Sequence, residues 1–306
     1  MARLGLPRPT QPDTEWLFAA HRAHLERVPY ENFEIQLGRA TTVDPAESIG
    51  RIVRGRGGYC FHLNSAFGTL LAGVGYDVTR HVGDVRGGSD DQDARSLTIN
   101  HQVLTVACEG ETWFVDAGLG DAPYEPMPLR AGTVTQGPYT YGLEPWDRSV
   151  RGAGHVGGGR ADVIVGGDRV GDSDGLGTLR GWRFVHDPKA ESFTSMVFAA
   201  EPVQVEAFAR AHHRLSTSPD SDFVRNAVAA RRDERGADVL RGRVLSIHGL
   251  IARGSPALGA LVIGFSADRI GLSHAVEVSS AALIVCLVAF VPLVRSVSSA
   301  TTEIAQ

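Results

Sequence analysis

Residues 54–64 of the chain read RGRGGYCFHLN. The glycines in the first half of this stretch interrupt regular structure, and the mostly apolar run that follows, residues 61–71, predicts a helix. Cys60 therefore lies at or near a helix N-terminus. The free N–H groups and the dipole of such a terminus favour a thiolate, so the sequence predicts a reactive cysteine.

His101 and Asp116 supply the other parts of an activated thiol. His101 lies at the start of the strand-like segment 103–107, and Asp116 follows the strand-like segment 112–115; residues 109–111 between them read as a hairpin turn. An antiparallel hairpin would bring the two side chains together. An imidazole beside a cysteine generates a thiolate, and a carboxylate behind the ring holds its tautomer. This set of groups suits acyl transfer through a thioester intermediate.

The composition narrows the class of protein. The chain has 306 residues, is 43% hydrophobic and 21% charged, and carries a net charge of −5, which is typical of a globular protein. The mild acidity gives no indication of nucleic-acid binding. Three cysteines at unrelated spacing (Cys60, Cys108 and Cys286) form neither a disulfide framework nor a zinc pattern. No apolar signal peptide opens the chain, so we expect a cytoplasmic protein with a free thiol.

Periodicity predicts helices before residue 76 and strands after it. Apolar positions at helical spacing predict a helix at 14–28, and Asp44 with Glu47 resembles a capping box that opens a second helix at 45–54. Strand signals prevail between residues 76 and 198, with a glycine- and aspartate-rich part at 152–181 that reads as loops. Residues 204–213 predict a short amphipathic helix, 216–221 a turn, and 223–228 the start of another short element.

Several motifs together resemble the arylamine N-acetyltransferase family. The resemblance covers residues 10 to 248, and its blocks stand in the order of the family. These blocks are VPYENFE (28–34), RGGYCF (56–61) with Asn64, NH (100–101), VDAGLG (115–120), QGPY (136–139), WRF (182–184) with HDP (186–188), and LSTSPDS (215–221).

The resemblance implies an α+β fold similar to that of papain-like proteases and transglutaminases. An N-terminal helical bundle at 1–84 would carry the nucleophilic cysteine, and a central antiparallel β-barrel at 85–198 would carry the histidine and the aspartate. A partial α/β lid would follow at 199–248. Residues 249–306 form an apolar tail to which no fold is assigned.

The resemblance also implies roles for individual residues. Cys60 would be acetylated by acetyl-coenzyme A, a co-substrate, with His101 as the base and Asp116 as its orienter. The acceptor, an arylamine or a hydrazine, would arrive after coenzyme A leaves, in a ping-pong sequence. Positions that match the family's substrate pocket are Tyr30, Phe61, Leu119 and Phe198; those that match its coenzyme contacts are Asn100, Gly118 and Gly120. Glu31 and Arg56 match a structural pair, expected as a buried ion pair.

Two positions depart from the family's pattern, and the tail departs further. His62 stands where the family usually has Glu or Gln, and Leu119 replaces the usual Phe, which predicts a reshaped acyl pocket. Residues 264–271, between apolar runs at 258–265 and 278–294, resemble an interhelical loop of major facilitator transporters. The second run reaches only the lower length limit of a membrane span, so membrane association through 258–294 and a core helix or fusion remnant stay open.

Other interpretations of the motifs are less specific. Gly118-Leu119-Gly120 could cradle a phosphate, but two glycines are also an ordinary turn. His212-His213 has no second ligand pair at zinc spacing, so we expect no metal. A relative that closes macrolactams from a carrier-bound acyl chain would use the same machinery as the acetyltransferase. A papain-type hydrolase would too, although the flanking blocks do not fit it. An inactive, membrane-tethered binding module is the third alternative. The sequence gives no oligomeric state.

Overall fold

A computed structural model describes residues 1–87, 97–121, 123–151, 176–190, 192–242 and residue 274. The chain divides into two units, Met1–Gly242 and Arg243–Gln306. The second unit contains one described residue, His274. The expectations for the tail at 249–306, for Cys286 and for the transporter-like segment therefore lie outside the described residues, as do most of the loops expected at 152–181 and residues 243–248 of the lid.

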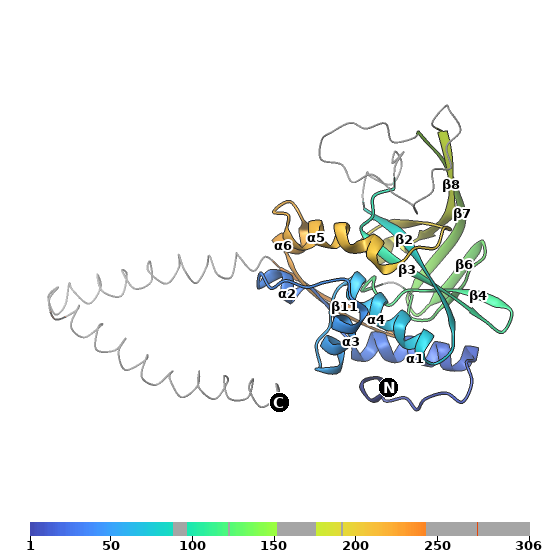
Figure 1. Cartoon of the computed structure of the whole chain (residues 1–306), viewed down its shortest axis with the longest axis horizontal. Coiled ribbons are helices and arrows are strands. Elements are labelled where there is room, and N and C mark those ends of the chain that lie inside the picture. Colours follow the sequence, from blue (N-terminus) through green and yellow to red (C-terminus); the bar gives the residue numbers. More distant parts are fainter. Residues whose placement is uncertain (88–96, 122, 152–175, 191, 243–273, 275–306) are drawn as a thin grey trace. The chain divides into compact units, whose positions relative to one another are not determined.

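The helices of the first unit form largely where the sequence predicts them. They are η1 (Ala2–Leu4), α1 (Thr14–Arg27), α2 (Phe33–Gln36), α3 (Pro45–Val53) and α4 (Cys60–Gly73). The Asp13 side chain caps α1 by accepting from Trp16 N at 2.7 Å, and the Asp44 side chain caps α3 by accepting from Ala46 N at 2.8 Å. α4 packs on α3 and on the strands β2 (Asp77–Arg86) and β3 (His101–Cys108) (Figure 1).

The capping box expected at the start of α3 does not form. Glu47 does not reach back to the amide of Asp44, which donates instead to Thr42 Oγ1 at 3.2 Å. The Glu47 carboxylate accepts from Thr42 N at 3.0 Å and from Arg51 at 2.7 Å. An arginine one helical turn away competes for the carboxylate, so α3 has an aspartate cap alone.

Eight strands form one antiparallel sheet. In spatial order they are β5 (Met127–Pro128), β4 (Glu111–Val115), β3 (His101–Cys108), β2 (Asp77–Arg86), β9 (Ser195–Ala199), β8 (Leu176–Val185), β7 (Tyr139–Arg151) and β6 (Gly132–Gln136). The predicted hairpin is β3–β4, in which Cys108 pairs with Glu111. Its turn residues Glu109 and Gly110 have φ of 51° and 82°, the values that a tight primed turn requires.

The sheet curls strongly. Phe114 on β4 stacks on Phe184 of β8 with ring centroids 5.5 Å apart and on Phe198 of β9 at 5.6 Å. β4 and β8 are separated by three strands in the sheet, so their side chains meet only because the sheet bends round an inner core. The predicted α+β class, helices with a nearly closed antiparallel barrel, is confirmed.

A second, three-stranded sheet joins distant parts of the chain. It has the order β1 (Tyr30–Glu31), β10 (Ala227–Asp233) and β11 (Gly236–Gly242). The remaining elements are η3 (Pro188–Ala190), η4 (Val205–Phe208), α5 (Ala209–Thr217) and α6 (Asp222–Arg225). The helix expected at 204–213 begins as the 3₁₀ turn η4 and continues to Thr217. Tyr30 pairs with Ala230, so the end of the first unit lies beside its beginning. The domain boundaries at 84 and 198 stay predictions.

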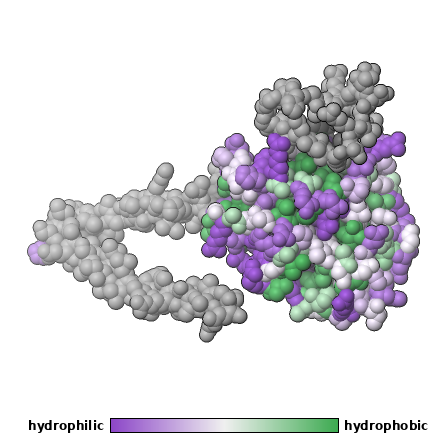
Figure 2. All heavy atoms as spheres, viewed as in Figure 1, coloured by the Kyte–Doolittle hydropathy of each residue, from purple (hydrophilic) through white to green (hydrophobic). Residues whose placement is uncertain are grey.

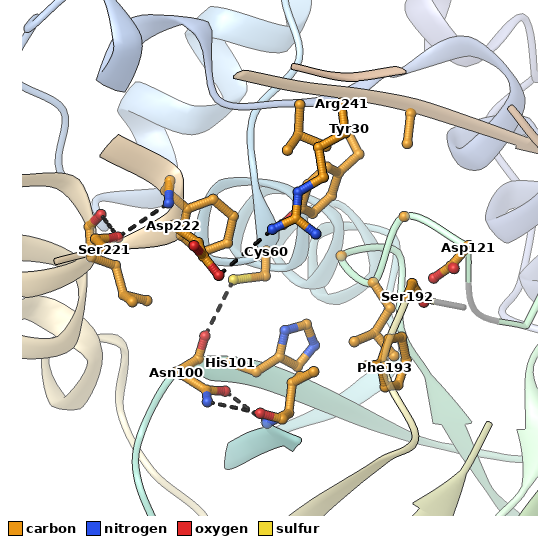
Figure 3. A pocket seen from close by; sticks show the side chains of 18 of the residues that line it. Tyr30, Cys60, Asn100, His101, Asp121, Ser192, Phe193, Ser221, Asp222 and Arg241 are labelled. Atoms are coloured by element: carbon orange, nitrogen blue, oxygen red, sulfur yellow. Dashed lines mark hydrogen bonds and ion pairs between the residues drawn. The ribbon is translucent and has the colours of Figure 1, made fainter. Parts of the chain in front are cut away.

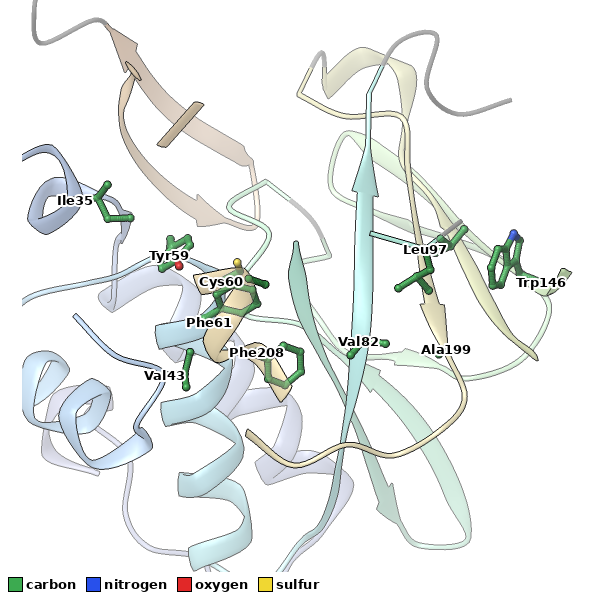
Figure 4. Close-up of a cluster of buried hydrophobic side chains, with 12 residues drawn as sticks. Ile35, Val43, Tyr59, Cys60, Phe61, Val82, Leu97, Trp146, Ala199 and Phe208 are labelled. Carbon is green, nitrogen blue, oxygen red and sulfur yellow. The ribbon is translucent and has the colours of Figure 1, made fainter. Parts of the chain in front are cut away.

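One core cluster surrounds the start of α4. Cys60, Tyr59 and Phe61 lie among buried side chains that include Phe208 of η4 and Val82 of β2 (Figure 4). On the visible face of the described part, hydrophobic and hydrophilic side chains are intermixed (Figure 2). The start of α4 is thus fixed from two sides, by helices and by the sheet.

Candidate active site

Cys60 is the first residue of α4. Its N-cap residue, Tyr59, has an extended backbone, and the Tyr59 side chain does not accept a hydrogen bond from the first turn. The positive end of the helix dipole therefore lies at Cys60 without a side-chain cap. The Cys60 side chain is 2% exposed, and its sulfur lies 3.7 Å from the main-chain oxygen of Asn100. The position predicted from residues 54–64 is confirmed.

Two glycines allow α4 to begin at this point. A Cβ atom on Gly57 would lie 2.0 Å from the main-chain oxygen of Pro29, and one on Gly58 would lie 2.6 Å from Cβ of His62. Neither position therefore has room for a side chain. The glycines before Cys60 therefore permit the close packing that orients the first turn of α4.

His101 and Asp116 lie in contact beside Cys60. His101 Nε2 is 2.7 Å from Asp116 Oδ2. In the β3–β4 ladder Leu104 pairs with Val115, so His101 and Asp116 are diagonal neighbours at the open end of the hairpin. Burial by itself lowers the pKa of His101. The charge of Asp116 and its hydrogen bond, then the hydrogen bond with Cys60 and the charge of Cys60, raise that pKa to about 10.

Asn64, one turn into α4, holds the carboxylate of Asp116. Its Nδ2 donates to Asp116 Oδ1 at 2.8 Å and to the main-chain oxygen of Gln102 at 2.5 Å, while its Oδ1 accepts from Ala117 N at 2.9 Å. Asp116 Oδ1 also accepts from Gly118 N at 2.9 Å. The sequence places Asn64 in a motif but does not indicate a role for it. Its buried amide joins the cysteine helix to the hairpin.

The cysteine faces a cavity of about 630 Å³. Figure 3 shows Cys60, Asn100 and His101 in it together with Tyr30, Phe193 and Arg241. The other residues of its wall are Val85, Gly118, Leu119, Gly120, Asp121, Ser192, Arg214, Leu215, Ser218, Asp220, Ser221, Asp222, Phe223, Val228, Ala230 and Val239. Helix, barrel and three-stranded sheet all contribute to it. A volume of this size accommodates a small molecule beside the sulfur.

The predicted pocket residues divide into two groups. Tyr30 and Leu119 line the cavity, whereas Phe61 and Phe198 are absent from the described part of its wall. Both phenylalanines are fully buried: Phe61 packs on Phe208 with ring centroids 5.4 Å apart, and Phe198 packs inside the barrel. Their aromatic side chains therefore belong to the cores around the start of α4 and inside the barrel.

All three predicted coenzyme contacts, Asn100, Gly118 and Gly120, line the cavity. The side chain of Asn100 is occupied by the protein: Nδ2 donates to Asp84 Oδ1 at 3.0 Å, and Oδ1 accepts from Val85 N at 2.7 Å. A Cβ on Gly118 would lie 2.9 Å from Cα of Cys60, and Gly120 has a φ of 80°. Close packing against α4 thus requires glycine at position 118, and the positive φ favours glycine at position 120.

The expected ion pair between Glu31 and Arg56 is wrong. Glu31 accepts from the main-chain N–H groups of Phe33 at 2.6 Å and Gly57 at 3.3 Å. Arg56 pairs instead with Glu34, at 2.6 Å. The buried carboxylate of Glu31 satisfies the amide of the first residue of α2 and an amide of the stretch before Cys60. Arg56, which is half-exposed, pairs with Glu34, whose carboxylate is more accessible than that of Glu31.

His62 and His212 pack together behind Cys60, with ring centroids 5.5 Å apart. His212 Nδ1 accepts from the Tyr59 hydroxyl at 2.6 Å, and its Nε2 donates to the main-chain oxygen of Thr41 at 2.7 Å. Burial, and then the charge of Arg51, hold the pKa of His62 well below its usual range. Within the described residues, no group of three or more His, Cys, Asp or Glu side chains could hold a metal ion.

No helix in the part of the chain that the structure describes is long and apolar enough to cross a membrane. The apolar run at 278–294 lies outside that part. Cys108, the other described cysteine, is free and buried in β3, and its thiol accepts from Thr14 Oγ1 at 3.8 Å. Cys60 is the described cysteine that lines the cavity.

The chain is similar to several known proteins. The profile of the N-acetyltransferase family matches residues 13–255. Among curated proteins, proansamycin X synthase of Amycolatopsis mediterranei is 30% identical over 141 residues, covering 44% of this chain and 53% of that protein. The arylamine N-acetyltransferase liver isozyme of Gallus gallus is 32% identical over 127 residues, covering 39% and 42%. The chain thus spans about half of the length of these relatives.

Solved structures extend the likeness to most of the fold. The N-arylamine acetyltransferase of Mycobacterium smegmatis, solved as a substituted variant, matches with a TM-score of 0.61 at 26% identity, covering 79% of this chain and 78% of that one. The arylamine N-acetyltransferase of Mycobacterium marinum in complex with CoA matches with a TM-score of 0.60 at 22% identity, covering 82% and 89%. The likeness to the second structure concerns the fold alone.

Proposed function

The chain belongs to the N-acetyltransferase family, and from this premise we propose that it moves an acetyl group from acetyl-coenzyme A to an arylamine or hydrazine nitrogen. The single observation that carries the proposal is the 2.7 Å contact between His101 and Asp116 beside Cys60, at the wall of a cavity. The activities for which the similar proteins are named support the acetyl donor and the aromatic amine. No metal is part of the proposal.

In the first half-reaction, the sulfur of Cys60 attacks the carbonyl carbon of the acetyl thioester. The bond between that carbon and the coenzyme sulfur then breaks, and the leaving sulfur takes the proton held by His101. A pKa of about 10 keeps the ring protonated at neutral pH in the free enzyme, so the proton is available for this transfer. The products are acetyl-Cys60, neutral His101 and coenzyme A.

In the second half-reaction, the amine nitrogen attacks the acetyl carbon of acetyl-Cys60. His101 accepts the proton that the nitrogen loses, and the carbon–sulfur bond breaks to release the amide and the Cys60 thiolate. Asp116 holds the ring through its Oδ2, while Asn64 and Gly118 donate to its Oδ1 and fix the orientation of the carboxylate. The ion pair of the free enzyme is thereby restored.

The roles of the wall residues follow from their positions. We assign Tyr30 and Leu119 to the pocket for the acyl group and the acceptor. Gly118, Gly120 and the main chain of Asn100 border the route of the coenzyme, since a wall without side chains leaves room for its narrow pantetheine arm. Phe61 and Phe198 support these positions from the two cores.

Trapping of the acyl-enzyme tests the proposal. After incubation with acetyl-coenzyme A and no acceptor, intact-protein and peptide mass spectrometry should show a gain of about 42 Da on Cys60, the mass of an acetyl group less a proton. Cys60→Ala should give no adduct, whereas Cys108→Ala, the matched control with the other described free cysteine, should keep it. An unmodified Cys60 in folded, reduced protein would overturn the proposal.

Two alternatives raised by the sequence have less support. A macrolactam-forming amide synthase would need room for a long acyl chain, and Leu119 in the cavity wall leaves more space than a phenylalanine there. Transfer from long acyl thioesters in preference to acetyl-coenzyme A would favour that activity. The inactive, membrane-tethered module depends on residues outside the described part; an acetyl adduct on Cys60 would exclude it.

A further inference from the structure

Asp121 places a second carboxylate in the cavity that Cys60 lines. It directly follows the loop Gly118-Leu119-Gly120, and Figure 3 shows it on the wall together with Phe193 and Tyr30. The residue is 4% exposed, so its carboxylate is almost enclosed and yet borders the open space. Neither the transfer mechanism nor the sequence motifs give this side chain a role.

The two arginines of the described wall have partners other than Asp121. Arg241 pairs with Asp222 at 3.6 Å, and both side chains are more than half exposed at the rim. Arg214 donates from Nη2 to the main-chain oxygen of Ile99 at 2.9 Å. The described partner of Asp121 Oδ1 is His186 Nε2, at 3.6 Å. Apart from His101, which gives up its proton when Cys60 is acetylated, the buried charged side chain of the described wall is therefore Asp121, and the arginines of the wall are engaged with other groups.

The charge of Asp121 acts in the space beside the sulfur. Its loop packs on α4, since a Cβ on Gly118 would lie 2.9 Å from Cα of Cys60. One on Gly120 would lie 3.7 Å from the ring of Tyr30. Burial raises the pKa of the Tyr30 phenol, and the charges of Cys60 and then Asp121 raise it further. Tyr30 thus stands within the fields of both the sulfur and the carboxylate.

We propose that Asp121 determines acceptor specificity: it excludes amines and hydrazines that carry a carboxylate and admits those that are neutral or cationic. The inference rests on the proposed acetyl transfer. Two like charges in a cavity bordered by protein repel each other more strongly than in bulk water, and a cation there is attracted for the same reason. The acceptor has to enter this space in order to reach acetyl-Cys60.

Three acceptors of the same shape test the proposal: 4-aminobenzoate, 4-aminobenzamide and 4-aminobenzamidine. They differ in charge, from anion to neutral molecule to cation, at the position opposite the amine. Enzyme first acetylated on Cys60 is mixed with each acceptor, and the loss of the acetyl group is followed by mass spectrometry. The neutral and cationic acceptors should react at least about tenfold faster than the anion at subsaturating concentration. The amine of 4-aminobenzoate is the most nucleophilic of the three, so the intrinsic reactivity of the acceptors alone predicts the opposite order of rates.

Asp121→Asn, which keeps the shape and removes the charge, should bring the rates for the anion and the neutral acceptor to within about threefold of each other. The control Asp220→Asn removes a carboxylate from the exposed rim of the same cavity and should keep the wild-type ratio. An unchanged ratio in Asp121→Asn, or a wild-type enzyme that prefers 4-aminobenzoate, would overturn the inference. Because acetylation is measured first, failure of the proposed function is seen separately as the absence of acetyl-Cys60.

Discussion

His101 Nε2 lies 2.7 Å from Asp116 Oδ2, although fifteen residues separate them in the chain. The β3–β4 hairpin accounts for the contact, because the first residue of one strand and the residue after the other meet at its open end. Cys60 reaches the same place from a helix. The pair would orient the ring and stabilise its positive charge, leaving the other ring nitrogen for the sulfur.

Asp116→Asn tests the importance of that charge. The amide lacks the negative charge and cannot satisfy both His101 and the two donors at Oδ1, so the ring loses its fixed tautomer. We expect acetyl transfer to slow by roughly three to four orders of magnitude and the pKa of His101 to fall from about 10 toward its ordinary value. Stopped-flow release of coenzyme A and an NMR titration of the ring measure the two effects. A normal rate would show that the carboxylate is dispensable.

Asn64→Ala should reduce both stability and rate. The substitution leaves Asp116 Oδ1, the Gln102 oxygen and the Ala117 amide short of a partner. Each buried group left unpaired costs about 1–3 kcal/mol. Thermal unfolding and steady-state kinetics should show a lower Tm and a kcat reduced by about tenfold or more, with KM changed less.

Ser65→Ala is the matched control for Asn64→Ala. Ser65 is the next residue of α4, is fully buried, and donates to the Gln102 side chain at 3.0 Å. Its loss should lower Tm and leave kcat close to the wild-type value. Equal effects of the two variants on kcat would mean that Asn64 acts through stability alone.

Gly118→Ala should impair the site through a single methyl group. The new Cβ would lie 2.9 Å from both Cα of Cys60 and Nδ2 of Asn64, closer than unstrained contacts allow. The loop has to move away from α4, so acetylation of Cys60 should slow by about tenfold or more. Gly142→Ala in β7 is the control: its nearest neighbour would be 3.4 Å away, an ordinary contact, and acetylation should be unaffected.

His24 predicts a loss of stability in acid. Burial, and then the charges of His21 and Arg3, lower its pKa to about 3 from an ordinary 6.5. Below 6.5 the unfolded chain binds a proton that the folded protein does not. The contribution of His24 is therefore complete above pH 6.5 and is lost as pH falls toward 3, by up to about 1.4 kcal/mol per pH unit. Denaturant unfolding across this range measures the slope.

His24→Leu should reduce that slope by about one proton, with the exposed His213→Gln as the control. His21, His62, His81 and His212 also have lowered pKa values, mainly because of burial, and add to the slope in the same direction. An unchanged slope in His24→Leu would show that the folded protein protonates His24 readily.

Local patterns were enough to predict the elements that carry the three central residues. Glycines followed by an apolar run identified the start of α4, and two strand-like segments around a short turn identified the hairpin. These features depend on interactions between residues close in sequence. The family motifs added the order of helices, strands and lid, and the likeness to solved structures confirms the fold class.

The partners of individual side chains were harder to predict. Glu31 and Arg56 lie near each other, yet each found a different partner, because main-chain amides and Glu34 compete for them. Phe61 and Phe198 belong to pocket motifs, but both side chains are fully buried, Phe61 in the core around the start of α4 and Phe198 inside the barrel. The partner of each side chain depends on which groups become neighbours after the whole chain has folded, and the local spacing of apolar and polar residues does not encode this.

The sequence by itself determined which groups are present and on which local elements they lie: a cysteine at a helix start, a histidine and an aspartate at the two ends of a hairpin, and glycines where the backbone turns. Only the tertiary structure decided that Asn64 donates a hydrogen bond to Asp116 and that Asp121 lines the same cavity as Cys60. The first kind of information is local, since backbone geometry and hydrophobic period are set within a few residues. The second arises from packing between segments that are distant in the chain.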